Sequence, residues 1–117
     1  MKLTEKLGRI FQTETHVARS AKIIAEHFSI ERRETARCVV LSLVSVLCVN
    51  VEHISPQTDI VKDLGADEDW EWAEIFLSIE EHLARRFQRD RRFEGRTVSE
   101  LIEFITTMLS HPNEERA

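Results

Sequence analysis

The 117-residue chain contains only three glycines and two prolines. A β-sandwich or barrel needs a tight turn about every ten residues, and these two residue types supply most such turns. Their scarcity argues against those folds and favours long helices. The length is that of a single domain, which buries roughly two thirds of the surface of its unfolded chain and can therefore fold without disulfides or metal.

Cysteine and long apolar runs are also limited. Cys38 and Cys48 lie inside an apolar run, where thiols behave as small hydrophobes, so we expect both to be buried and reduced. The longest apolar stretch, residues 38–51, is too short and too interrupted by serine to span a bilayer, and the first eleven residues contain no continuous apolar region. These features predict a cytoplasmic protein without a membrane span. The net charge of −5 disfavours nucleic acid as a partner.

Recognisable catalytic and metal-binding motifs are missing. The sequence has no phosphate-binding loop, GxGxxG or GxSxG, and its five histidines and two cysteines show no metal-ligand spacing. We therefore predict a protein that is not an enzyme, with no catalytic residue, metal or cofactor. The acids of residues 63–74 match a calcium loop poorly, because Glu68 occupies the position that requires glycine. They are better explained as acids that stabilise a helix N-terminus.

Apolar residues at a spacing of three and four predict a helix over residues 3–28, either continuous or broken at residues 13–16. A second helix is expected over residues 31–51. Its β-branched residues favour a strand, but a fourteen-residue apolar run is too long for one. This helix is apolar on every side and must be covered, either by residues 1–30 or by a second copy of the chain in a homodimer. The expected contacts are Phe11, Ile24 and Phe28.

Two further helices are predicted, over residues 68–87 and 97–109, separated by a basic stretch over residues 85–96. The last helix begins with the capping-box pattern Thr97-Val98-Ser99-Glu100. In the preceding helix Trp72 belongs to the apolar stripe. Trp70 lies about 200° away around the same helix and should be partly exposed.

Three segments carry a family resemblance. Ile60-Val61-Lys62-Asp63-Leu64-Gly65-Ala66-Asp67 resembles the loop signature of acyl carrier proteins, Ile79-Glu80-Glu81 with Leu83 resembles the end of their second helix, and Thr97-Val98 with Leu101-Ile102 resembles their fourth helix. The resemblance covers about residues 31–110. It implies an all-α fold, an acyl-carrier-protein-like four-helix bundle over residues 31–110, with a helical extension over residues 1–30 and a tail over residues 111–117, in one compact domain.

Members of that family carry phosphopantetheine on a serine at the start of their second helix. Glu68 stands at the equivalent position, or Asp69 if one residue is inserted, and neither side chain can form the phosphodiester. Ser78 lies more than two turns further along. The resemblance thus implies a carrier-like protein without the cofactor, which binds a protein partner in fatty-acid, lipid or polyketide-type metabolism. A functional carrier with an unconventional attachment site and a helical assembly or adaptor subunit that shares only the fold remain as alternatives.

The candidate partner-binding residues are Trp70, Glu71, Glu74, Arg89 and Arg92. An exposed tryptophan beside the attachment position is a suitable binding anchor, unless the N-terminal helix or a dimer mate covers it. The arginines replace residues that are usually acidic in the family. They suit phosphate or an acidic partner, although a charged run is more often a solvated loop.

Overall fold

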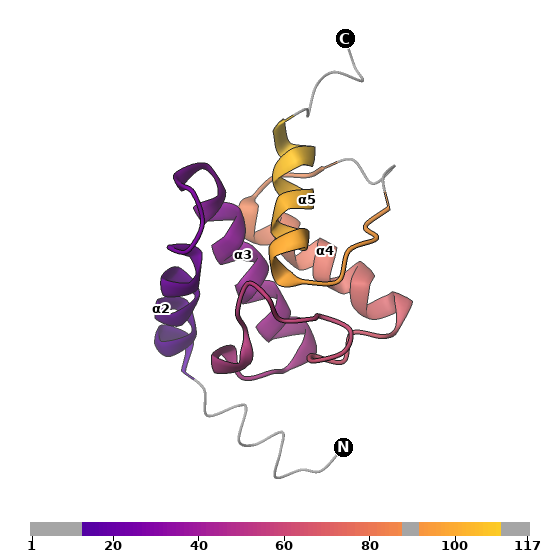
Figure 1. Ribbon diagram of the computed structural model, residues 1–117, viewed down its shortest axis with the longest axis horizontal. Coiled ribbons are helices and arrows are strands. Elements are labelled where there is room, and N and C mark those ends of the chain that lie inside the picture. Colours follow the sequence, from indigo (N-terminus) through magenta and orange to yellow (C-terminus); the bar gives the residue numbers. More distant parts are fainter. Residues whose placement is uncertain (1–12, 88–91, 111–117) are drawn as a thin grey trace.

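The computed structural model describes residues 13–87 and 92–110. These residues form four α-helices and one short 3-10 helix (Figure 1), namely α2 (Glu14–Ala25), α3 (Ile30–Leu47), η1 (Val51–His53), α4 (Asp69–Leu83) and α5 (Val98–Ser110). The described part contains no strand, and its β-type pairing is an isolated bridge between Asp59 and Thr97. The predicted all-α class is therefore confirmed. Within this part, no helix combines the length and the apolar character needed to cross a membrane.

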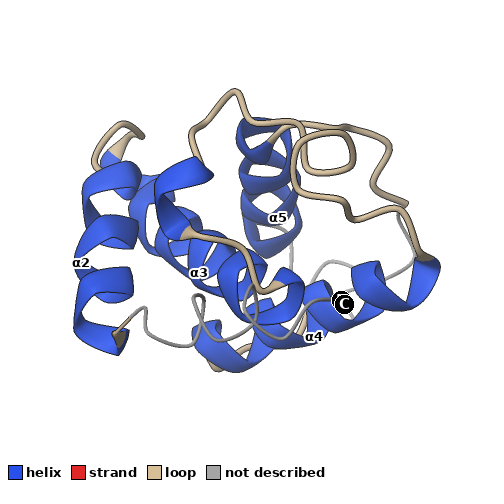
Figure 2. Cartoon of the chain, turned by 90° about the horizontal axis from the view of Figure 1, so that it is seen from below, coloured by secondary structure: helices blue, strands red, loops and turns tan. Residues whose placement is uncertain are grey.

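Helix α3 is the central element of the fold. It contacts α2, α4 and α5, and both Figure 1 and Figure 2 show α2 on one side of it and α4 with α5 on the other. The fully buried side chains in its middle include Cys38, Val39, Val40 and Leu43. The remaining side of the helix is less covered, because Ser45 is exposed and Arg37 and Leu41 are only half-buried. The prediction that this all-round apolar helix is covered on every side is therefore confirmed only for the sides that face α2, α4 and α5. The cover on the α2 side comes from the same chain and requires no second copy.

Helix α2 begins at a well-formed cap. The hydroxyl of Thr13, whose backbone is extended, accepts a hydrogen bond from the backbone N–H of His16 at 3.0 Å. A continuous helix through residue 13 is therefore excluded, as the alternative with a break at residues 13–16 predicts. Ala21 and Ala25 are buried, and their small side chains allow a close approach of α2 to the core. Of the three expected contact residues, Ile24 and Phe28 pack against the core, whereas Phe11 lies outside the described residues.

The prediction that the second helix continues to residue 51 is wrong. Helix α3 ends at Leu47 because Cys48 adopts a left-handed backbone conformation with φ 55°, which cannot continue a right-handed helix. The chain then turns into η1 and buries Val51. Both cysteines are free, as predicted, but only Cys38 is buried. Cys48 is exposed because it lies at the turn.

Helix α4 also ends earlier than predicted, at Leu83 instead of residue 87. Ala84 is left-handed, with φ 57°, and the chain reverses so that Phe87 returns to α4. There the backbone N–H of Phe87 donates to the buried carboxylate of Glu80 at 3.2 Å. No helix occurs among the described residues between Leu83 and Val98. A four-helix carrier bundle with an additional N-terminal helix would contain five α-helices. The described part contains four, and the helix missing from it is the one expected between α4 and α5.

The long loop before α4 is tied to the start of α5. The N–H of Ile60 donates to the carbonyl of Arg96 at 2.7 Å, and the N–H of Val98 donates to the carbonyl of Thr58 at 3.0 Å. The guanidinium of Arg96 also donates to the carboxylate of Asp59 at 2.9 Å, and this contact lowers the pKa of Asp59. These contacts hold the loop, and with it the N-terminus of α4, against the C-terminal helix.

The predicted capping box of the last helix is confirmed. The hydroxyl of Thr97 accepts from the N–H of Glu100 at 3.1 Å, and the carboxylate of Glu100 accepts from the N–H of Thr97 at 3.0 Å. The same carboxylate accepts from the N–H of Arg96 at 2.7 Å, and these backbone donors lower the pKa of Glu100. The beginning of α5 is therefore specified by its own local sequence.

Candidate functional site

The start of α4 carries acids at the two positions that the resemblance equates with the attachment serine of acyl carrier proteins. Glu68 precedes the helix as its N-cap residue, and Asp69 is the first helical residue. The carboxylate of Glu71 accepts from the backbone N–H of Glu68 at 3.1 Å, as in a capping box. Both candidate positions thus lie at a helix N-terminus, where the positive end of the helix dipole favours negative charge. A carboxylate provides that charge directly and leaves no hydroxyl to modify.

Ser78 offers little as a replacement attachment site. It lies nine residues after Asp69, which is about 14 Å along the helix axis. Its side chain is half-buried, and its hydroxyl lies 3.4 Å from Nδ1 of His82. A phosphopantetheine arm on Ser78 would therefore start from the middle of α4 instead of from its N-terminus.

Helix α4 has three faces, which differ in how far their side chains are buried. Ile75 and Ile79 are fully buried and face the core. A second face carries Trp72 and Phe76, which are half-buried and pack against other aromatic rings. The third face is exposed, and we call it the outer α4 surface, formed by Trp70, Ala73, Glu74, Leu77 and Glu81.

The outer α4 surface contains two of the large hydrophobic side chains that the fold leaves exposed. Trp70 is 61% exposed and Leu77 is 43% exposed. A separation of seven residues is about two helical turns, so both side chains lie on the same side of α4 with Glu74 between them. The predicted exposure of Trp70 is confirmed, and neither α2 nor any other described element covers it.

The five predicted partner-binding residues do not form one cluster. Trp70 and Glu74 share the outer α4 surface, whereas Glu71 is half-buried and serves as a capping residue. Arg92 lies on the other side of α4 at a pocket, and Arg89 is outside the described residues. Trp70 and Arg92 lie on different sides of α4 because the helix ends at Leu83 and residues 92–96 return along the side that faces α5.

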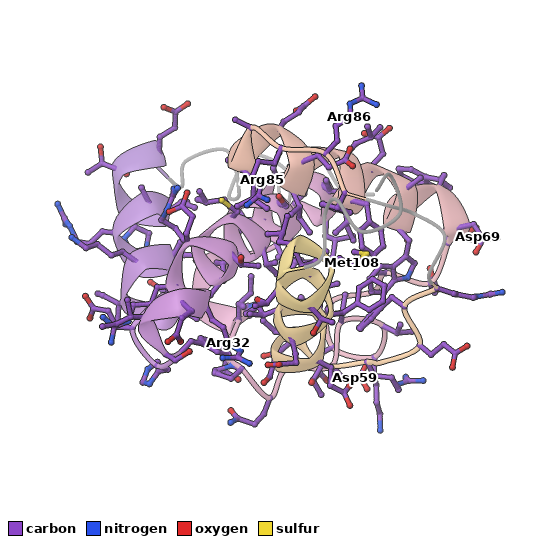
Figure 3. The ribbon with its side chains drawn as sticks, turned by 90° about the horizontal axis from the view of Figure 1, so that it is seen from above. Arg32, Asp59, Asp69, Arg85, Arg86 and Met108 are labelled. Carbon is purple, nitrogen blue, oxygen red and sulfur yellow. The ribbon has the colours of Figure 1, made fainter. Side chains whose placement is uncertain are left out.

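The arginines of the basic stretch are likewise dispersed. Arg85 and Arg86 are exposed just after α4, and Figure 3 shows them well separated from Asp69 at the other end of that helix. Arg96 is paired with Asp59. The described arginines of the stretch therefore do not gather into one basic cluster, which agrees with the interpretation of the run as a solvated loop.

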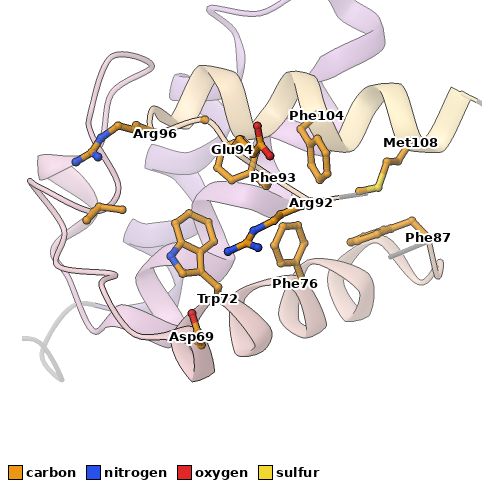
Figure 4. Close-up of a pocket in the computed structure, with 12 residues that line it drawn as sticks. Asp69, Trp72, Phe76, Phe87, Arg92, Phe93, Glu94, Arg96, Phe104 and Met108 are labelled. Carbon is orange, nitrogen blue, oxygen red and sulfur yellow. The ribbon is translucent and has the colours of Figure 1, made fainter. Parts of the chain in front are cut away.

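An open pocket of about 670 Å³ lies between α4, α5 and residues 92–96. We call it the aromatic pocket, because its apolar lining is mainly aromatic (Figure 4), with Trp72, Phe76, Phe87, Phe93, Phe104 and Met108. Ring centroids of neighbouring members lie 5.3–6.3 Å apart, in tilted or edge-on arrangements that aromatic pairs favour. This pocket was not predicted from the sequence. The apolar stripes contained Trp72, Phe76 and Phe104, but nothing local showed that Phe93 joins them.

Two rings of the pocket are held by specific contacts. The indole Nε1–H of Trp72 donates to the carbonyl of Ala66 at 2.9 Å. The ring of Phe93 lies over Gly95, where an added Cβ would approach ring atoms to 2.8 Å and Cβ of Glu100 to 2.9 Å. Glycine is therefore required at position 95 for steric reasons. The pocket walls are positioned by the fold before any ligand arrives.

The reactive groups elsewhere in the described part are few. Burial raises the pKa of the Cys38 thiol to about 11, so this group stays protonated at neutral pH and is a poor nucleophile. Residues 13–87 and 92–110 contain no group of three or more histidine, cysteine, aspartate or glutamate side chains that could hold a metal ion. The two surfaces of α4 are therefore the main candidate sites.

Comparison with protein-family models gives no match for this chain, and a search of curated proteins also gives none. The likeness to acyl carrier proteins therefore depends on the three sequence segments quoted above.

Proposed function

We propose that the chain is an acyl-carrier-protein-like protein that is not an enzyme, carries no phosphopantetheine, and acts by docking a protein partner through the outer α4 surface. The order of α3, a long loop, α4 and α5 supports this proposal, because it follows the family pattern in order and approximate length. The acids at the start of α4 support the loss of the cofactor. By the same resemblance, the pathway is fatty-acid, lipid or polyketide-type metabolism.

The observation that carries the docking proposal is the exposure of Trp70. A tryptophan that is 61% exposed keeps a large apolar area in water, and a folded domain gains nothing from that arrangement. Tryptophan is among the residues that most often dominate binding energy at protein interfaces. Leu77 extends the apolar strip along the same side of α4.

The chemistry of the outer α4 surface also indicates the kind of partner. Glu74 and Glu81 are the charged members of this surface, and both are exposed. An apolar strip beside carboxylates is complementary to a partner that presents apolar side chains flanked by lysine or arginine. We therefore propose a basic, partly apolar protein surface as the partner.

The absence of the cofactor is tested by incubating the full chain with a phosphopantetheinyl transferase and coenzyme A, followed by mass spectrometry. We expect no mass gain. A gain of one phosphopantetheine would overturn this part of the proposal in favour of an unconventional attachment site. The matched control removes Glu68 and carries Asp69→Ser, which should recover some modification. If that variant folds but remains unmodified, the loss of the serine alone does not explain the lack of cofactor.

The docking surface is tested with a photo-cross-linking amino acid at position 77, in an extract of the cells that produce the protein. Position 23 is the matched control, because Ile23 is also a large exposed hydrophobic residue but lies on α2. We expect a discrete product from position 77 only, and its loss in Trp70→Ala.

The partner is then purified and its affinity is measured directly. If Trp70 is a principal anchor, Trp70→Ala should weaken binding about thirtyfold or more, whereas Ile23→Ala should not change it. Equal cross-linking from both positions, or affinity independent of Trp70, would contradict the proposed surface. Cross-linking mainly from position 23 would instead support an assembly subunit that uses α2.

A further inference from the structure

We propose that the aromatic pocket binds a small organic monoanion with a flat aromatic body, and that the guanidinium of Arg92 pairs with its acidic group. This site is separate from the outer α4 surface. The inference does not depend on the proposed docking function.

The size and lining of the pocket fit a small aromatic molecule. Its volume of about 670 Å³ lies inside the range of roughly 300–1,000 Å³ that is common for small-molecule sites. Trp72, Phe76, Phe93 and Phe104 are only half-buried, so their rings pack against one another and still leave area open to the pocket. A flat aromatic guest can continue this set of tilted ring contacts.

The walls are also prearranged, which reduces the ordering cost of binding. The hydrogen bond from Trp72 to the carbonyl of Ala66 sets the orientation of the indole. The packing of Phe93 over Gly95 fixes the orientation of a second ring. The centroid of the Phe93 ring lies 5.5 Å from that of Trp72 and 5.3 Å from that of Phe104. Three rings from three segments of the chain therefore form one rigid wall.

The charges at the pocket favour a single negative charge on the ligand. Of the two arginines that line it, Arg96 is paired with Asp59, whereas Arg92 is exposed and has no ion-pair partner among the described residues. In the view of Figure 4 the guanidinium of Arg92 projects between the rings of Trp72 and Phe76, at the pocket that all three residues line. A guanidinium binds a carboxylate through two parallel hydrogen bonds. The acids Asp69 and Glu94 also line the pocket and repel negative charge, so the ligand should carry only one acidic group, placed at the guanidinium of Arg92.

The test uses the full chain with three probes of similar size, namely 2-naphthoate, its neutral analogue 2-naphthamide, and the aliphatic carboxylate decanoate. Affinities are measured by calorimetry. Binding is located by NMR from the indole N–H signals of the two tryptophans. Trp72 lines the pocket and Trp70 lies on the opposite side of α4, so Trp70 is an internal control. We expect 2-naphthoate to bind best and to shift the signal of Trp72 alone.

Arg92→Gln should weaken binding of 2-naphthoate about tenfold, which is the loss expected for one charge-assisted contact, and leave 2-naphthamide unchanged. Arg86→Gln is the matched control, because Arg86 is an exposed arginine outside the pocket and should have no effect. A dissociation constant for 2-naphthoate weaker than about 1 mM, or a shift at Trp70 instead of Trp72, would overturn the site. Equal affinity for 2-naphthamide and 2-naphthoate would show that the pocket does not select an anion. Tighter binding of decanoate would show that it does not select an aromatic body.

Discussion

The variant Ala21→Asp tests whether α2 is an integral part of the folded domain. Ala21 is fully buried on α2, whereas Ala18, three residues earlier on the same helix, is exposed. Replacing alanine with aspartate costs about 0.5–0.7 kcal/mol of helix propensity at either position. The difference between Ala21→Asp and Ala18→Asp therefore reports the effect of burial.

The size of the effect follows from what α2 contributes. Burying a polar group without a hydrogen bond costs about 2–7 kcal/mol, and a charge costs more, so we expect α2 to separate instead of burying the carboxylate. The loss then cannot exceed the docking free energy of α2. Val17, Ile24 and Phe28 are half-buried against the core, and each should contribute about half of the 1.5–3 kcal/mol assigned to a fully buried side chain. We therefore expect Ala21→Asp to lower the free energy of unfolding by about 2–4 kcal/mol, and Ala18→Asp by less than about 1 kcal/mol.

The assay is urea unfolding at neutral pH, followed by circular dichroism and by tryptophan fluorescence. Both tryptophans lie on α4, so their fluorescence reports unfolding of the body of the domain. Binding of a hydrophobic dye in native buffer reports separation of α2. Deletion of residues 1–28 should increase dye binding and aggregation in the same way. Equal losses in Ala18→Asp and Ala21→Asp, or a deletion variant that stays monomeric and equally stable, would refute an integral role for α2.

Three further changes probe the elements around the two surfaces of α4. Gly95→Ala should destabilise the domain by about 1–3 kcal/mol, because the new Cβ would strike the ring of Phe93; an unchanged urea midpoint would contradict the steric account. Thr97→Ala should cost about 1 kcal/mol through loss of the α5 cap, measured by thermal unfolding, and no loss would argue against the cap. Hydrogen bonding to Arg32 lowers the pKa of Glu103 below its ordinary value of 4.5, so this pair stabilises the fold above about pH 4.5 and loses that contribution as the pH falls through the lowered value. The stability difference between wild type and Glu103→Gln should therefore shrink below pH 4.5, and a constant difference down to pH 3 would contradict the pairing.

The elements that the sequence predicted correctly are those governed by local spacing. A repeat of three and four residues places apolar side chains on one side of a helix whatever the rest of the chain does, so the cores of α2 and α4 were predictable. Helix α3 was predictable from the length of its apolar run, which exceeds that of a strand. The exposure of Trp70 and the cap at Thr97 are equally local, because each depends on residues within one turn. The need to cover α3 followed from its composition alone.

The features that the sequence left undecided depend on contacts between distant segments. Cys48 and Ala84 end their helices in left-handed conformations that neither residue prefers, and each turn lets a following apolar residue, Val51 or Phe87, become buried. The aromatic pocket joins a ring from a non-helical segment, Phe93, to rings of α4 and α5. Helix ends, the direction in which α2 folds back and the composition of the pocket were decided by tertiary structure, because the free energy of burying a side chain depends on what packs against it and not on its sequence neighbours.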